Sequence, residues 1–198
     1  MSASVAIAEE QPQIETFVPR IVHKRERHQT FTAFEDPFLI AVESKEFSGL
    51  EWIHYLDVHR YSVSPWAHDI ITRKEFSHCL DEKLNLVILD GRMFLDKERL
   101  PKQARMIAVN MGLVAPPVDA ALMLRMQLSD EMMFQNDWES LIVMHDPIEV
   151  SNCQSSFLTL SANSDKRTDW SVSTFAAKNV LIPKEFGLVF WDQFNMLG

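Results

Sequence analysis

The sequence contains few glycines, and their spacing excludes two common classes of site. Five glycines are present, at positions 49, 91, 112, 187 and 198. A P-loop or a dinucleotide-binding turn needs several glycines within one loop, because the backbone must approach the phosphate closely. No two glycines of this chain fall within one loop, so neither a phosphate-cradling P-loop nor a dinucleotide fingerprint can be formed.

Cysteine is scarcer still. Cys79 and Cys153 lie far apart and form no Cys-x-x-Cys pair, which excludes a disulfide scaffold and predicts buried thiols in a reduced, cytoplasmic protein. The Gly-x-Ser-x-Gly elbow, the His-Glu-x-x-His zinc motif and the deaminase pairing of His-x-Glu with Pro-Cys-x-x-Cys are also missing;. No reaction class is therefore indicated by a motif.

Clustered positive charge is mostly missing too. The formal net charge is -9, which disfavours nucleic acid and anionic membrane as partners and favours solubility and basic partners. The one strongly basic stretch, residues 20–28, is interpreted as a solvated surface segment, with an arm for an acidic partner as the alternative. Residues 1–13 have no basic n-region and no continuous apolar stretch, so they predict a flexible tail over residues 1–14 rather than a secretory signal.

The 198 residues, 46% of them hydrophobic, suffice for one well-filled core;. We therefore expect a single α+β domain over residues 15–198. Its most informative stretch begins with Leu86-Val87-Ile88-Leu89, continues through Asp90-Gly91 and is followed by Met93-Phe94-Leu95. Asp-Gly between apolar runs predicts a tight hairpin over residues 84–95. The first arm is apolar at four successive positions, which predicts a strand covered on both faces.

Periodicity and capping signals predict the helices that follow this hairpin. An apolar stripe over residues 101–111, with Gly112 after it, predicts one helix. Residues 118–128 are apolar on nearly all sides, apart from Asp119, Arg125 and Gln127. They predict a buried core helix that is too short to cross a bilayer. Ser129-Asp130 predicts a cap for a further helical turn, and residues 141–144 predict a strand.

The remaining signals place helices early in the chain and strands late. Predicted helices cover residues 49–60, 66–71 and 72–83, and three serine or threonine caps support them: Ser48 with Glu51, Ser64 before Pro65, and Thr72 with Glu75;. Predicted strands cover residues 38–42, 156–160, 170–175 and 188–191;. The resulting prediction is an α+β fold with a helix-rich N-terminal half and an antiparallel sheet built from the 84–95 hairpin and the C-terminal strands.

Two Glu-x-x-His units are the sharpest candidates for chemistry. Each unit places a carboxylate and an imidazole on one helix face; the pairs are Glu51 with His54 and Glu75 with His78. The helices of a carboxylate-bridged di-iron bundle carry the same arrangement. These faces, however, lie opposite the apolar stripes of their predicted helices, and both glutamates already serve as capping residues. We favour exposed helix residues and keep a transition-metal site as the alternative, with no other cofactor expected.

Further histidines add candidate ligands without forming a site. The further possible metal ligands are His59, His68 and His145. His145, at the end of a predicted strand, is the best isolated candidate for a general base;. A surface or hydrogen-bonded histidine is the favoured interpretation. Neither His68-Asp69 nor His145-Asp146 is a dyad, because adjacent residues point in different directions.

Methionine is concentrated in the middle of the chain, where eight of the ten fall between Met93 and Met144. Flexible, polarisable side chains of this kind can line an adaptable pocket for an apolar ligand or form a groove for a partner helix. The candidate pocket residues are Met123, Met126, Met133, Phe134 and Met144. Core filling is the favoured alternative.

Three hypotheses for function follow. The first is a cytoplasmic, non-catalytic binding or interaction protein, whose partner is a protein or an apolar small molecule and which could form a homodimer. The second is an enzyme or sensor with a His/Glu metal site. The third is an acidic inhibitor that occupies a basic partner surface, motivated by net charge alone.

Overall fold

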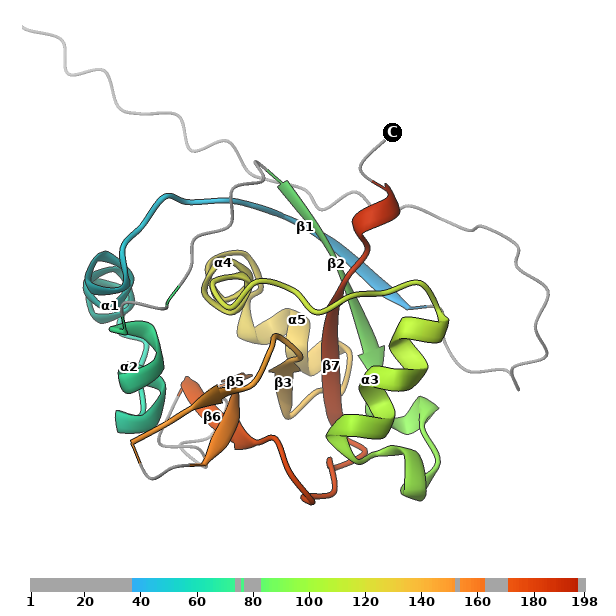
Figure 1. Ribbon diagram of the computed structural model, residues 1–198. Coiled ribbons are helices and arrows are strands. Elements are labelled where there is room, and N and C mark those ends of the chain that lie inside the picture. Colours follow the sequence, from blue (N-terminus) through green and yellow to red (C-terminus); the bar gives the residue numbers. More distant parts are fainter. Residues whose placement is uncertain (1–36, 74–75, 77–82, 152–153, 163–170, 196–198) are drawn as a thin grey trace, which may run out of the picture.

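The computed structural model describes residues 37–73, 76, 83–151, 154–162 and 171–195. The predicted tail, the basic stretch at residues 20–28 and both cysteines lie outside these residues. The described residues form a seven-stranded sheet with helices on both faces (Figure 1). The strands are β1 (Phe38–Glu43), β2 (Lys83–Asp90), β3 (Ser140–Val143), β4 (Ile148–Glu149), β5 (Ser155–Ser161), β6 (Val172–Ala176) and β7 (Phe186–Trp191). The α-helices are α1 (Gly49–Val58), α2 (Pro65–Ile71), α3 (Pro101–Asn110), α4 (Ala120–Gln127) and α5 (Asp130–Gln135). Three short 3₁₀ segments are η1 (Gly91–Met93), η2 (Asp96–Glu98) and η3 (Gln193–Asn195).

The sheet is mixed rather than antiparallel. Its strand order is β1-β2-β7-β3-β5-β4, with β6 paired to β5. The pair β3 and β7 is parallel, and the other pairs are antiparallel. The prediction of an antiparallel sheet was wrong at this pair, because the last strand inserts between β2 and β3 instead of adding to an edge.

The predicted 84–95 hairpin was also wrong, although its first arm is a strand. As expected from its unbroken apolar run, β2 lies inside the sheet, between β1 and β7. After β2 the chain does not fold back as a second strand but continues into η1. The side chain of Asp90 accepts a hydrogen bond from the backbone N–H of Arg92 at 2.7 Å, and this bond caps η1. Arg92 in turn donates to the Asp90 carboxylate through its guanidinium.

Gly91 explains why the Asp-Gly signal misled. Gly91 does not adopt the positive φ that a type I′ turn requires, and Gly112 is the one described glycine that does;. A Cβ atom at Gly91 would instead lie 2.6–2.9 Å from the backbone oxygens of Phe186, Lys184 and Pro183. The glycine is required here because another backbone segment approaches closely. From the sequence alone, a glycine required for close approach cannot be distinguished from one required for a turn.

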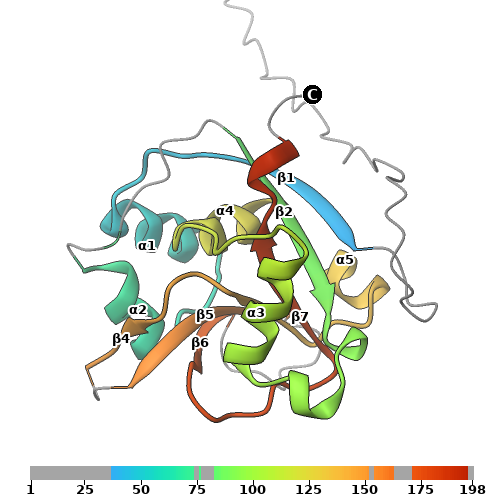
Figure 2. The same cartoon turned by 45° about the vertical axis from the view of Figure 1, so that its right-hand side comes forward.

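Side chains of the sheet alternate between two separate hydrophobic clusters. Leu84, Leu86 and Ile88 of β2 join a cluster with α1, α2, α4 and α5, which we term the four-helix face. Val87 and Leu89 join a cluster with α3, which we term the single-helix face. Figure 2 shows α3 crossing one side of the sheet, with α1 and α4 behind it. The molecule is therefore a three-layer arrangement with unequal outer layers.

Helix α4 is the buried helix predicted from its composition. Every residue from Ala120 to Arg125 is buried. The guanidinium of Arg125 donates to Asp130 Oδ1 at 2.6 Å and to the carbonyl of Leu128 at 3.0 Å, and it lies 4.7 Å from the ring centroid of Tyr61. A buried cation is tolerated only with such partners. The mid-helix arginine is therefore part of the core.

Capping signals located most helix ends correctly. Ser48 and Glu51 form the predicted capping box, and the hydroxyls of Ser64 and Ser129 accept from Ala67 N and Met132 N, both at 3.2 Å. The predicted helix over residues 72–83 was wrong at both ends. Thr72 is the C-cap of α2, and Lys83 is the first residue of β2. Residues 74–75 and 77–82 lie outside the described part of the chain.

The class of helices combined with a sheet is confirmed, but its distribution along the chain is not. Three of the five described α-helices, α3, α4 and α5, begin after residue 100, so within the described residues the helices are not concentrated in the N-terminal half. Among the described residues, no helix has the length and apolar character that a membrane crossing demands.

Candidate functional site

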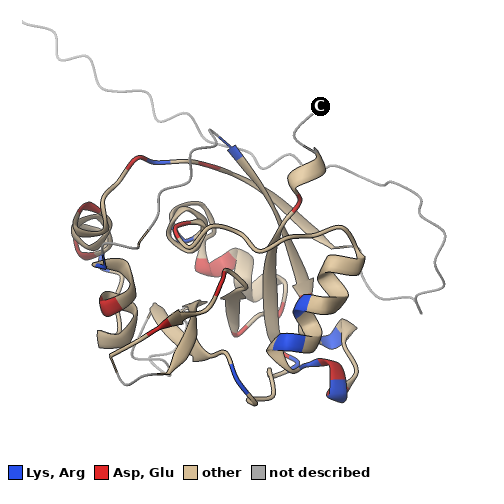
Figure 3. Cartoon of the chain, viewed as in Figure 1, with Lys and Arg blue, Asp and Glu red and all other residues tan. Residues whose placement is uncertain are grey.

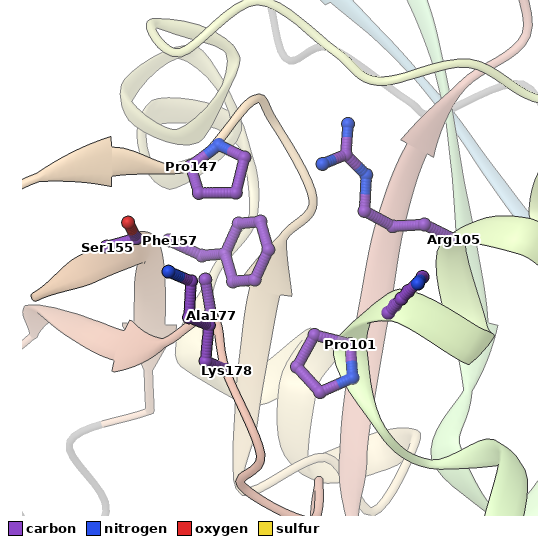
Figure 4. Close-up of a pocket in the computed structure, with 8 residues that line it drawn as sticks. Pro101, Arg105, Pro147, Ser155, Phe157, Ala177 and Lys178 are labelled. Carbon is purple, nitrogen blue, oxygen red and sulfur yellow. The ribbon is translucent and has the colours of Figure 1, made fainter.

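A pocket of about 440 Å³ opens at the margin of the single-helix face. It lies between the first turns of α3, the β3–β4 connection, the start of β5 and the segment after β6 (Figure 4). Its lining residues are Pro101, Lys102, Arg105, Pro147, Ser155, Phe157, Ala177 and Lys178. Small-molecule sites usually occupy about 300–1,000 Å³, so the volume suits a small organic ligand.

The apolar part of the lining consists of Pro101, Pro147, Phe157 and Ala177. Phe157 belongs to the hydrophobic cluster of the single-helix face and is 1% exposed as a residue, yet its ring borders the cavity. Figure 4 shows this ring between Pro147 on one side and Pro101 on the other, with Ala177 nearby. A ligand could therefore place an apolar body against the exposed Pro147 and the half-buried Ala177.

The rim of the pocket is positively charged. Lys102 and Arg105 come from α3, and Lys178 comes from the segment that follows β6. Arg105 forms an ion pair with Asp146, with 2.6 Å between the guanidinium nitrogen and Oδ1. Neither lysine has a carboxylate partner within the described residues. The first turn of α3 receives no side-chain cap, so its backbone N–H groups add to the positive potential;.

The pocket exists because the sheet is interrupted beside β5. β3 pairs with residues 159–161 of β5, and β4 resumes pairing at residues 155 and 156. Between these pairings, residues 144–147 leave the ladder, and the backbone N–H of Leu158 donates to Nε2 of His145 at 2.9 Å. A side chain thus replaces the missing main-chain acceptor, and Pro147 is free to form a wall of the pocket.

His145 is held neutral at this interruption. The residue is 1% exposed, and burial is the main reason that the pKa of His145 falls from the usual 6.5 to about 4, with a smaller contribution from Arg105;. Because Nε2 accepts from Leu158, Nδ1 carries the hydrogen and donates to the carbonyl of Asp146 at 2.7 Å;. The ring also contacts Phe157 edge-on, with 5.8 Å between centroids. Both nitrogens are engaged, which leaves none for a metal or for proton transfer.

The predicted Glu-x-x-His units do not meet in the described structure. Glu51 and His54 are exposed on α1, and Glu51 Oε2 accepts from the backbone N–H of Ser48 at 2.7 Å. Glu75 and His78 lie outside the described residues, so the pairing itself stays a prediction. Among the residues that the structure describes, no three His, Cys, Asp or Glu side chains are grouped to hold a metal. The reserve ligands His59 and His68 are exposed.

The methionine-rich residues proposed as a pocket are divided between the two faces. Met123 and Met133 are fully buried in the cluster of the four-helix face, and Met126 packs against that cluster. Met144 is fully buried in the other cluster. Phe134 is 42% exposed. None of the five lines the cavity beside α3.

Sequence reasoning missed the residues that do line it. Lys102 and Arg105 lie three residues apart on the polar side of a correctly predicted helix, which places both on one surface;. That spacing was a usable signal. Lys178, by contrast, comes from a distant segment, and only the sheet topology brings it near α3.

The chain was compared with known proteins at three levels. No model of a protein family matches it, and neither a curated protein nor a solved structure shows significant similarity.

Proposed function

We propose that this chain is a non-catalytic binding protein and that the pocket beside α3 is its ligand site. The observation that carries the proposal is the combination in one cavity of an apolar surface at Pro147 and Ala177 with a rim of cations at Lys102, Arg105 and Lys178. Ligand sites in proteins combine an apolar lining with a few convergent polar groups in this way.

The composition of the lining supports binding rather than catalysis. The residues that line the cavity include no histidine, cysteine or carboxylate, and their one hydroxyl belongs to Ser155. General acid–base or nucleophilic catalysis needs a base within hydrogen-bond reach of the reacting group. His145, the nearest candidate, is held neutral with both nitrogens engaged. Apart from the two lysines, the lining therefore offers no group that could act as a general base or nucleophile, which favours binding over catalysis;.

A fragment screen monitored by amide chemical shifts tests this proposal. We expect saturable shifts at residues of the pocket, and we expect Ala177→Trp, which fills the cavity, to abolish them. Val58→Trp is the control, because Val58 is 61% exposed on α1 and lies far from the lining residues. Absence of any fragment at the pocket, or binding that Ala177→Trp leaves unchanged, would contradict the proposal.

The other hypotheses from the sequence have no supporting observation of equal weight. In Figure 3 the acidic residues are spread over several elements, including α1, α2 and α5, and this distribution does not favour an acidic inhibitor that presents one charged face. Elemental analysis of tag-free protein tests the metal site. Cytoplasmic location and assembly as a homodimer remain predictions.

A further inference from the structure

Within the described residues, most lysines and arginines lie in the two stretches that flank the pocket. Twelve lysines and arginines fall within the described residues, and seven of them come from the two stretches that flank the cavity. These seven are Arg92, Lys97, Arg99, Lys102, Arg105, Lys178 and Lys184. Figure 3 shows the blue residues gathered at the lower end of α3 and in the loops beside it. Four of these seven form ion pairs with carboxylates, namely Arg92, Arg99, Arg105 and Lys184. The lining cations without a carboxylate partner among the described residues are Lys102 and Lys178, and their charge favours a negatively charged ligand;.

The apolar part of the lining shows that charge alone does not define the ligand. A bare inorganic anion at the rim would leave the exposed Pro147 and the half-buried Ala177 uncovered. An anion attached to a small apolar or aromatic body would contact both parts of the cavity. Burying that body against Pro147 and Ala177 would add favourable transfer free energy to the electrostatic attraction;.

Arg105 is the one cation of the rim that has a carboxylate partner in the described structure, and that partner is Asp146. Its carboxylate contacts Arg105 at 2.6 Å, and its side chain is 89% exposed, so it can leave without disturbing the core. The backbone at Asp146 is held separately, because its carbonyl accepts from the His145 ring at 2.7 Å. An exposed ion pair is worth only about 0–1 kcal/mol. A ligand anion can therefore replace this carboxylate while the loop stays in place.

We infer that the ligand is a small organic anion whose negative group binds between Lys102, Lys178 and Arg105, and that Asp146 competes with it for Arg105. This inference rests on the proposed function, since it names the ligand class of the same pocket. It predicts opposite effects for two kinds of charge removal at one site. Loss of the lysine charges weakens binding, and loss of the Asp146 charge strengthens it.

Three probes separate the two parts of the ligand. Phenyl phosphate carries both an anion and a ring, inorganic phosphate carries only the anion, and benzyl alcohol carries only the ring. We expect calorimetry or chemical-shift titration to show phenyl phosphate binding about tenfold more tightly than either of the others, which corresponds to about 1.4 kcal/mol. Its affinity should also fall as salt is added.

Charge variants test the competition. We expect the double variant Lys102→Gln/Lys178→Gln to weaken phenyl phosphate about tenfold or more and to leave benzyl alcohol unchanged. Asp146→Asn should tighten phenyl phosphate by about two- to fivefold, in line with the small energy of an exposed pair. Lys83→Gln is the matched control, because Lys83 is exposed at the start of β2 and does not line the pocket. It should change the affinity by less than about twofold.

The outcomes distinguish this inference from the proposed function. If benzyl alcohol binds in the pocket as tightly as phenyl phosphate, the pocket is a ligand site but the anion is not recognised. If inorganic phosphate binds as tightly as phenyl phosphate, the apolar body is not recognised. Weaker or unchanged binding by Asp146→Asn overturns the competition. Only a pocket that takes none of the probes and none of the screened fragments overturns the proposed function as well.

Discussion

The two faces of the sheet differ in how completely they are covered. In the described residues, the four-helix face buries a cluster of 28 hydrophobic residues, and the single-helix face buries a cluster of 12. The first contains Trp52, Leu56 and the whole inner surface of α4. The second contains Ala104 and Ala108 of α3, whose small side chains let one short helix lie close to the sheet.

This difference separates stability from binding. A cluster enclosed by four helices excludes water on every side, so its residues contribute mainly to folding. The smaller cluster ends at Phe157, whose ring is both part of the core and the floor of an open cavity. A single covering helix thus leaves a margin where core side chains and surface cations line the same space.

The largest expected change in the free energy of unfolding comes from replacing a buried methionine, and one methionine from each face is compared. Met123 and Met144 are both fully buried, in the larger and the smaller cluster respectively. We expect Met123→Ala to lower the free energy of unfolding by about 2–5 kcal/mol, and Met144→Ala to lie near the lower limit, about 2 kcal/mol. The site of Met144 lies next to a loop at an open margin, so the surrounding residues can collapse into the space more easily.

Urea unfolding of both variants measures this comparison. Met106→Ala is the control, because Met106 is 55% exposed on α3 and should lose less than about 0.5 kcal/mol;. An equal or larger loss for Met144→Ala would show that the single-helix face is packed as tightly as the other. Met126, the other methionine of α4, is only partly buried. Met123 is therefore the sharper test.

The second prediction uses pH to probe the open margin. The folded-state pKa of His145 is about 4, below the 6.5 of the unfolded chain. Between these values the unfolded state binds more protons, so stability is fully present above about pH 6.5 and is lost as the pH falls toward 4. The expected slope is about 1.4 kcal/mol per pH unit near pH 5.

Urea unfolding at a series of pH values checks this slope. His145→Gln should remove it, because the glutamine side chain does not titrate, while its oxygen can still accept from Leu158. His54→Gln, at an exposed position of α1, should leave the slope unchanged. If His145→Gln and the wild type lose stability in parallel between pH 6.5 and 4, the histidine is not buried neutral.

Much of the fold could be predicted from the sequence because its signals are local. The serine caps of α1, α2 and α5 act within three residues, and the apolar run of β2 reports directly on burial at both faces;. The pairing of β7 with β3 could not be predicted. Which strands become neighbours depends on how the two hydrophobic clusters assemble, and the strand sequences themselves do not encode it.

The candidate site could be predicted only in part. Lys102 and Arg105 share a helix surface, so their spacing indicates a paired basic patch on α3;. The aromatic floor could not be found this way. Phe157 belongs to an ordinary buried strand, and only the interruption at residues 144–147 gives it access to the cavity. That interruption depends on His145 accepting from a backbone N–H thirteen residues away.

The smallest expected effect lies at the opposite edge of the sheet, where a side chain again replaces a strand. β1 pairs only with β2 among the described strands, and Gln127 at the end of α4 covers part of its outer edge. In the amide orientation that satisfies both groups, Gln127 donates to the carbonyl of Ala41 at 3.0 Å and accepts from Glu43 N at 2.9 Å. These are the bonds that a neighbouring strand would make.

We expect Gln127→Met, which keeps the side-chain length but not the polar atoms, to lower the free energy of unfolding by only about 1 kcal/mol, because Ala41 and Glu43 are exposed and water can replace the amide;. Urea unfolding measures this loss. Gln135→Met, at an exposed position of α5, should be neutral. Faster hydrogen exchange at Glu43 in Gln127→Met, with exchange at Leu158 unchanged, would show that the two edges are closed independently. Unchanged exchange at Glu43 would show that the amide of Gln127 does not protect the β1 edge.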